Sequence, residues 1–209
     1  MDKKYLNIVK HYESCLEKYG DTHKGVDWPN KEDAVTRYQI MLEVIREQSN
    51  VSLLDFGCGT GHLLEYILNQ YDNFENIGYQ GLDISEQYIE IARKKFPEYK
   101  FYQLDIFDKG PQNLGHIDYT IMNGVFTEKR ELSFDEMWDY FQELVSLVFD
   151  YSKKGIAFNV MSKAVDWERE DLFHLPTDLL IDFLTKKLSR NFIIRNDYGL
   201  YEYTVYLYK

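Results

Sequence analysis

From residue 51 onward, short apolar segments alternate with longer segments in which apolar residues recur at helical spacing. The short segments 51–56, 78–83, 99–104, 117–123 and 155–161 are typical of buried strands. Alternation of strand and helix predicts a parallel sheet covered by helices on both faces. Two last segments, 191–196 and 201–208, flank Asp197-Tyr198-Gly199 and resemble a hairpin, so one of them is expected to run antiparallel.

Capping residues and apolar periodicity predict the helices. Ser133 and Glu136 match a capping box ahead of a long apolar stripe, which is the strongest helix signal in the chain. Ser85 is expected to cap a helix that ends before Pro97, and another helix is expected over 177–188.

The first fifty residues lack strand segments and contain two helical patterns, 3–19 and 31–48, around an irregular stretch at 20–30. We interpret 1–50 as an N-terminal helical cap or lid packed on a main domain at 51–209. The length of 209 residues suits one structural domain overall.

Composition narrows the possible partners. The formal charge of −11 disfavours nucleic acid as a substrate, because such affinity depends on clustered Lys and Arg. Cys15 and Cys58 give no disulfide framework, and no apolar run is long enough to span a bilayer. We therefore expect a cytoplasmic protein without membrane insertion, and the sequence predicts no oligomeric state.

The segment Leu53-Leu54-Asp55-Phe56-Gly57-Cys58-Gly59-Thr60-Gly61 joins the first strand to a helix. It resembles motif I of class I S-adenosylmethionine-dependent methyltransferases, in which glycines turn the chain sharply and let a ligand approach the backbone. Asp55 separates this interpretation from dinucleotide binding. A carboxylate is an awkward neighbour for a pyrophosphate but suits a ligand with a cationic amino group and a sulfonium.

Two further carboxylates end the next strands. Asp83, in Gly81-Leu82-Asp83-Ile84, is at the position that accepts hydrogen bonds from adenosine ribose hydroxyls, and Ile84 is expected on the adenine face. Asp105 and Ile106 form the aspartate and apolar pair that, in the family, contacts the amino edge and faces of adenine.

The resemblance covers residues 51–161 well and the remainder in topology only. It implies a three-layer, Rossmann-like class I methyltransferase fold, with a seven-stranded, mostly parallel sheet that has one antiparallel strand near the C-terminus, plus the N-terminal helices. The cofactor implied is S-adenosyl-L-methionine, with S-adenosyl-L-homocysteine as product. Its contacts are expected from Asp55, Gly57, Cys58, Gly59, Gly61, Asp83, Ile84, Asp105 and Ile106.

Three residues outside these motifs are further candidates for cofactor contacts. Asn123 follows the fourth strand, where the fold class borders the methyl-transfer centre, and it can contact cofactor or acceptor. Trp28 lies in a loop beside the first strand, and Arg37 on the following helix could clamp the methionine carboxylate.

Methyl transfer is a direct displacement that chiefly requires alignment of donor and acceptor, with a base for a weak nucleophile. The candidates for that base are His174, His23, Asp166 and Glu128, and no spacing signature decides among them. No group of His, Cys, Asp and Glu has the spacing of a metal site, so the sequence predicts a metal-independent reaction.

The leading hypothesis is methyl transfer to a small or medium polar acceptor, such as a sugar derivative or another metabolite. Alternatives are a member of the fold that binds cofactor without turnover, a protein methyltransferase with a basic partner, and an NAD-dependent reductase. Asp55 disfavours the reductase. The sequence leaves the acceptor atom open among O, N, S and C.

Overall fold

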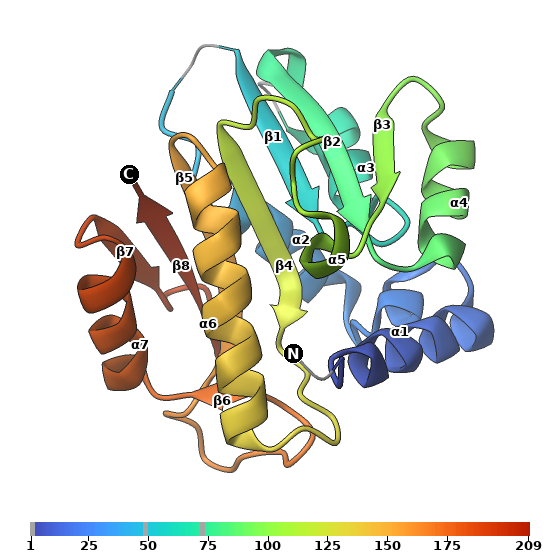
Figure 1. Ribbon diagram of the computed structural model, residues 1–209. Coiled ribbons are helices and arrows are strands. Elements are labelled where there is room, and N and C mark those ends of the chain that lie inside the picture. The colour runs from blue at the N-terminus through green and yellow to red at the C-terminus, as the bar shows by residue number, and fades with distance from the viewer. Residues whose placement is uncertain (1–2, 48–49, 72–73) are drawn as a thin grey trace.

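The computed structural model describes residues 3–47, 50–71 and 74–209. Its centre is a sheet in which the strands follow the order β3-β2-β1-β4-β5-β8-β7 (Figure 1). The strands are β1 (Val51–Phe56), β2 (Ile77–Asp83), β3 (Lys100–Gln103), β4 (Tyr119–Phe126), β5 (Gly155–Ser162), β6 (His174–Leu175), β7 (Phe192–Arg195) and β8 (Glu202–Tyr208).

The pairing of the strands confirms the predicted topology. Strand β1 pairs in parallel with both β2 and β4, and β8 runs antiparallel to both β5 and β7. One feature is additional: the two-residue strand β6 pairs in parallel with β5 outside the main order, within a stretch predicted to be a connection. Strand β6 is too short to show an alternation of apolar and polar residues, so the sequence gives no signal for it.

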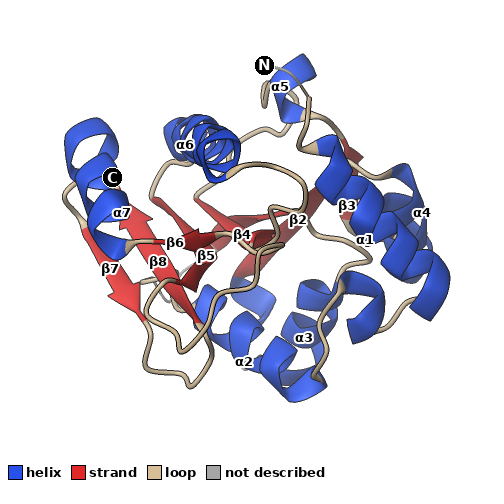
Figure 2. Ribbon diagram, turned by 90° about the horizontal axis from the view of Figure 1, so that it is seen from below, coloured by secondary structure: helices blue, strands red, loops and turns tan. Residues whose placement is uncertain are grey.

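Helices cover the two faces of the sheet (Figure 2). On one face α5 (Ile106–Lys109), α6 (Phe134–Tyr151) and α7 (Thr177–Phe183) share an apolar core with the sheet. On the other face a second core joins the sheet to α2 (Lys31–Leu42), α3 (His62–Gln70) and α4 (Glu86–Lys95). These two cores give the three layers expected of the fold class.

The predicted caps are confirmed in part. Ser133 and Glu136 form the predicted capping box, each accepting a hydrogen bond from the other's backbone N–H. Ser85 precedes α4 as predicted, but its side chain does not cap the helix. Its hydroxyl donates to Glu13 instead, at 2.7 Å.

Two predicted helix ends differ from the structure. The helix predicted over 31–48 ends at Leu42, and residue 48 itself lies outside the described residues. The helix predicted over 177–188 is α-helical to Phe183 and continues as a π-helix, η3 (Leu184–Leu188). Side-chain packing rather than helix propensity sets such ends, which explains why local signals miss them.

The N-terminal helices occupy different places. Helix α1 (Leu6–Tyr19) crosses beneath the carboxyl ends of the central strands (Figure 1), whereas α2 is part of the layer on one face. Between them is a 3-10 helix, η1 (His23–Val26), in the stretch predicted to be irregular; another, η2 (Phe74–Asn76), precedes β2. The division into a cap and a main domain at residue 50 stays a prediction. No helix in the described part of the chain is long and apolar enough to cross a membrane.

Candidate active site

A cavity lies between α1 and the carboxyl ends of β1, β2 and β4. Ten of the predicted contact residues line it together: Asp55, Gly57, Cys58, Gly59, Asp83, Ile84, Asp105, Ile106, Asn123 and Trp28. They come from separate strand ends, as expected when ligands bind at the carboxyl edge of a parallel sheet.

The glycine turn after β1 is built from left-handed backbone and bonds to β2. Gly57, Gly59 and Gly61 have φ angles of 75°, 53° and 85°, which side chains rarely adopt. The N–H groups of Gly57 and Cys58 both donate to the Leu82 carbonyl, at 2.7 and 3.0 Å. The turn is therefore held against the end of β2, with its backbone exposed to the cavity.

Asp83 supports this turn with its side chain. One carboxylate oxygen accepts from the Gly59 N–H and the other from the Ser85 N–H, each at 2.9 Å. Burial raises the pKa of the Asp83 carboxyl, and these backbone hydrogen bonds act against that increase. Each oxygen has a second lone pair, so the carboxylate keeps capacity to accept from a ligand.

Asp55 lies deeper, with 3% of its surface exposed. Its Oδ2 accepts a hydrogen bond from the Tyr79 hydroxyl at 2.7 Å. Burial raises the pKa of Asp55 to about 7; the Tyr79 bond lowers it and the nearby charge of Asp83 raises it. The carboxyl is therefore poised to ionise near neutral pH, and a cationic ligand would favour the ionised form.

Asp105 is held by the first residues of the chain that the structure describes. Its Oδ1 caps α5 by accepting from the Phe107 N–H at 3.1 Å. Its Oδ2 accepts from the Tyr5 hydroxyl at 2.8 Å and from Lys3 Nζ at 3.0 Å. The predicted adenine contact thus also anchors the start of α1 over the cavity.

The end of β4 contributes an unpaired polar atom. Asn123 lines the cavity, and its buried Oδ1 has no hydrogen-bond partner among the described residues. The next residue, Gly124, has a φ of 80°, donates its N–H to Asn159 at 2.8 Å and accepts at its carbonyl from the Tyr12 hydroxyl at 3.2 Å. Burying an acceptor without a hydrogen bond costs free energy, so this oxygen points to a ligand that donates a hydrogen bond.

Part of the chain matches a known protein family. Residues 54–149 match the model of a family described as a methyltransferase domain. The "Putative methyltransferase Rv1506c" of Mycobacterium tuberculosis is 25% identical over 180 residues, which cover 80% of this chain and 99% of that protein. The chain contains a methyltransferase domain.

Solved structures agree with this assignment at the level of the fold. Magnesium protoporphyrin IX methyltransferase from Synechocystis PCC 6803, crystallised with S-adenosylmethionine, is 18% identical and has a TM-score of 0.62, with 100% of this chain and 98% of that chain covered. The plantazolicin methyltransferase BpumL, crystallised with S-adenosylhomocysteine, is 17% identical with a TM-score of 0.60 and covers 100% and 99%.

The cavity of this methyltransferase fits the chemistry of S-adenosylmethionine. The carboxyls of buried Asp55 and half-buried Asp83 suit its positive charge and hydroxyls, and Ile84 and Ile106 offer apolar surface to adenine. The unpaired Oδ1 of Asn123 offers an acceptor.

Two of the predicted cofactor contacts, Gly61 and Arg37, are not among the residues that line the cavity. Gly61 is the N-cap of α3, and a Cβ there would be 3.0 Å from the Phe96 ring, so this glycine permits close packing. Arg37 is buried and ion-paired with Glu202, Nη2 to Oε2, at 2.7 Å. The Cζ atom of its guanidinium also lies 4.0 Å from the ring centroid of Trp28. Arg37 therefore packs against Trp28, which lines the cavity.

The four candidate bases all lie off the cavity lining, as far as the described residues define it. Buried His174 has both ring nitrogens engaged, with the Ser162 carbonyl at 2.6 Å and the Arg169 N–H at 3.2 Å. Glu128 is buried beside Arg130, His23 belongs to η1, and Asp166 is exposed in the connection after β5. We therefore assign the role of general base to none of the four.

Several lining residues were absent from the sequence prediction. Helix α1 contributes Ile8 and Tyr12, and Tyr5 is its N-cap; Tyr88 of α4 and Tyr140 of α6 also line the cavity. The signal was available in part, because Tyr5, Ile8 and Tyr12 recur at helical spacing on one side of α1. That spacing identifies a buried face without indicating what it covers.

Proposed function

We propose that this methyltransferase transfers the methyl group of S-adenosylmethionine to a small or medium polar acceptor, such as a sugar derivative or another metabolite. The observation that carries the proposal is the buried, unpaired Oδ1 of Asn123 in a cavity walled by α1. A wall of this kind favours a compact acceptor over a segment of folded protein. A cytoplasmic location, and the exclusion of nucleic acid, stay predictions.

In this proposal the cofactor supplies a methyl group activated by its sulfonium, and the chain supplies alignment. Asp83 accepts from the ribose hydroxyls through its remaining lone pairs, and Asp55 balances the positive charge of the amino acid part. Ile84 and Ile106 enclose adenine. Asn123 accepts a hydrogen bond from the cofactor or the acceptor and orients it for displacement.

The aromatic wall excludes water from the reacting atoms. Tyr12 donates to the Gly124 carbonyl, and the Tyr88 hydroxyl lies 2.8 and 2.7 Å from the Tyr12 and Gly25 carbonyls. These bonds tie α1 to β4 and tie both α1 and η1 to α4. Because the Tyr12 and Tyr88 hydroxyls already donate to backbone carbonyls, we assign these two tyrosines to shaping the cavity and not to proton transfer.

Support for a small acceptor also comes from the similar proteins. One solved structure of this fold is a methyltransferase named for magnesium protoporphyrin IX, which is a small molecule. The acceptor of the present chain is proposed only as a class, since the acceptor side of such sites varies among members of one fold.

The test has two steps. First, calorimetry and thermal unfolding are run with S-adenosylmethionine, S-adenosylhomocysteine and NADH; we expect the first two to raise the unfolding midpoint and NADH to leave it unchanged. Second, methyl-labelled cofactor is incubated with a metabolite extract, a protein extract and total RNA. Label is expected in the metabolite fraction.

Each other outcome selects another function. Label in the protein fraction would favour a protein methyltransferase, and binding without turnover in any fraction would favour a cofactor-binding scaffold. Stabilisation by NADH alone would overturn the proposal. As a control, Asn123→Ala should remain folded and lower kcat/KM for the metabolite fraction by about tenfold or more, in line with the loss of one hydrogen bond in the reacting complex.

A further inference from the structure

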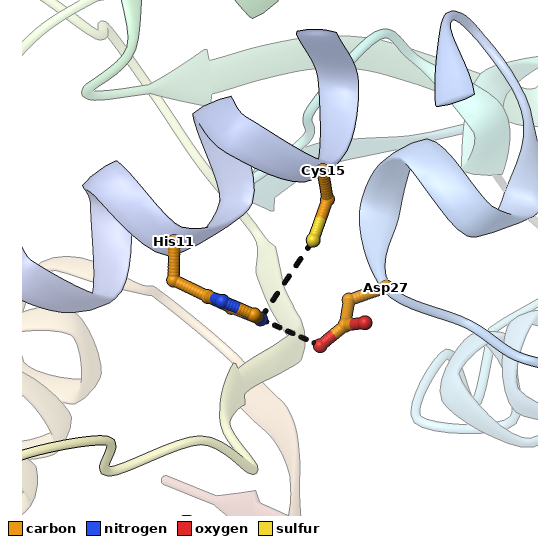
Figure 3. A group of neighbouring side chains, drawn as sticks. All are labelled: His11, Cys15 and Asp27. Carbon is orange, nitrogen blue, oxygen red and sulfur yellow. Dashed lines mark hydrogen bonds and ion pairs between the residues drawn. The ribbon is translucent and has the colours of Figure 1, made fainter. Parts of the chain in front are cut away.

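Three side chains of different chemistry converge outside the cofactor cavity: His11, Cys15 and Asp27 (Figure 3). His11 and Cys15 lie one turn apart on α1, and Asp27 is the residue that ends η1. His11 Nε2 is 2.8 Å from Asp27 Oδ2 and 3.8 Å from Cys15 Sγ. All three potential ligand atoms lie within 4.8 Å of one another.

The local backbone explains why they meet. Residues four apart on a helix share a face, so the imidazole and the thiol point the same way. Asp27 has a left-handed φ of 59° and donates its N–H to the His23 and Lys24 carbonyls. This sharp ending of η1 turns the carboxylate toward α1.

The separations are close to those of a zinc site. With Zn–N, Zn–O and Zn–S bonds of about 2.0, 2.1 and 2.3 Å at tetrahedral angles, N···O is about 3.4 Å and N···S about 3.5 Å. The observed distances are 2.8 and 3.8 Å. Side-chain rotations that lengthen N···O by about 0.6 Å and shorten N···S by about 0.3 Å would bring these separations to those of a zinc site.

The electrostatic surroundings favour a cation. The thiol of Cys15 is 8% exposed, and burial raises its pKa, as do the charges of Asp27 and Glu128, whereas Arg130 lowers it. Two carboxylates thus face the thiol against one guanidinium. A divalent ion would replace the thiol proton, which leaves to solvent, and would be balanced by this negative potential.

We propose that His11, Cys15 and Asp27 form a binding site for a borderline-soft divalent cation, Zn²⁺, with the fourth position taken by water. Thiolate, imidazole and carboxylate are the ligands that zinc prefers. His11 binds through Nε2, with the proton on Nδ1.

The position of the site gives it a structural role. Tyr12, beside His11, and Val26, beside Asp27, both line the cofactor cavity. A cation shared by α1 and the end of η1 would therefore fasten together two segments that cover the cofactor. It would not take part in methyl transfer, so a test of this inference is independent of the metal-independent reaction that the sequence predicts.

The chain offers a matched control, because Cys58 is its one other cysteine. The reduced, tag-free protein is titrated with Zn²⁺ by calorimetry and with Co²⁺ as a spectroscopic probe. We expect one ion per chain and, with Co²⁺, a thiolate charge-transfer band. Cys15→Ser should abolish the band and weaken Zn²⁺ binding by about 100-fold, whereas Cys58→Ser should retain both.

Two further measurements guard against misfolding. His11→Gln and Asp27→Asn should each weaken Zn²⁺ binding by at least about tenfold, while circular dichroism verifies that each variant is folded. Zn²⁺ should raise the unfolding midpoint of the unsubstituted protein and not that of the Cys15→Ser variant. A Co²⁺ complex without a thiolate band, or equal Zn²⁺ affinity with and without Cys15, would overturn the proposal.

Discussion

The affinity of this methyltransferase for S-adenosylmethionine should increase with pH across neutrality, because Asp55 must ionise to balance the ligand's positive charge. Burial raises the Asp55 pKa to about 7 in the free protein. At that pKa about a tenth of the carboxyls are ionised at pH 6 and about nine tenths at pH 8. If only the ionised form binds well, affinity rises by about tenfold, or about 1.4 kcal/mol, between these values.

Calorimetric titration of the cofactor at closely spaced pH values from 6 to 8 measures this change. Other titratable groups also line the cavity, among them Asp83, whose pKa is likewise raised by burial, and His62. The variant Asp55→Asn separates their contribution, because an amide keeps the shape and can still accept from Tyr79.

We expect the variant to bind weakly at every pH and to lose the tenfold increase. Equal pH dependence in both proteins would refute the role of Asp55, and so would an affinity of the unsubstituted protein that stays flat over the range. Either result would require another source for the charge balance.

Four further outcomes follow from the structure. Because the pKa of Asp55 is raised, the folded state holds the Asp55 proton more tightly than the unfolded state. The contribution of this group to stability therefore declines as pH rises toward 7. We expect the unfolding midpoint of Asp55→Asn to rise relative to that of the unsubstituted protein between pH 6 and 8. Glu202→Ala should lower the free energy of unfolding in urea by about 3–5 kcal/mol, because it leaves a buried arginine unpaired. Gly124→Ala should lower both the unfolding midpoint and activity, since its Cβ would lie 2.9 Å from a tryptophan ring, whereas Gly199→Ala, with a similar φ of 76° in open space, should cost only the backbone strain of about 1–2 kcal/mol and leave activity intact. Asp83→Asn should weaken cofactor binding by about 10- to 100-fold in calorimetry with little change in fold, and unchanged affinity would contradict the ribose assignment.

Local signals predicted most of the fold. The capping box at Ser133 and the glycine turn after β1 depend on residues a few positions apart, and both are found where the sequence places them. The alternation of strands and helices likewise predicted a parallel sheet, and β1 pairs in parallel with both β2 and β4.

What the sequence did not predict depends on contacts between distant residues. Arg37 has the chemistry of a carboxylate clamp, yet its partner is Glu202 on the last strand, 165 positions away. His11 and Asp27 are separated by a helix end and a 3-10 turn, so no spacing rule brings them together. Such pairs become visible only when tertiary packing is known.

The buried contacts of Glu202 extend to the reacting end of the sheet. Glu202 Oε1 accepts from Asn159 Nδ2 at 2.9 Å, and Asn159 Oδ1 in turn accepts from the Gly124 N–H at 2.8 Å. The final strand thereby fixes the residue that adjoins Asn123. A shortened protein that stops ahead of this strand would retain every recognisable sequence motif, yet it would lack the scaffold that aims the donor at its acceptor.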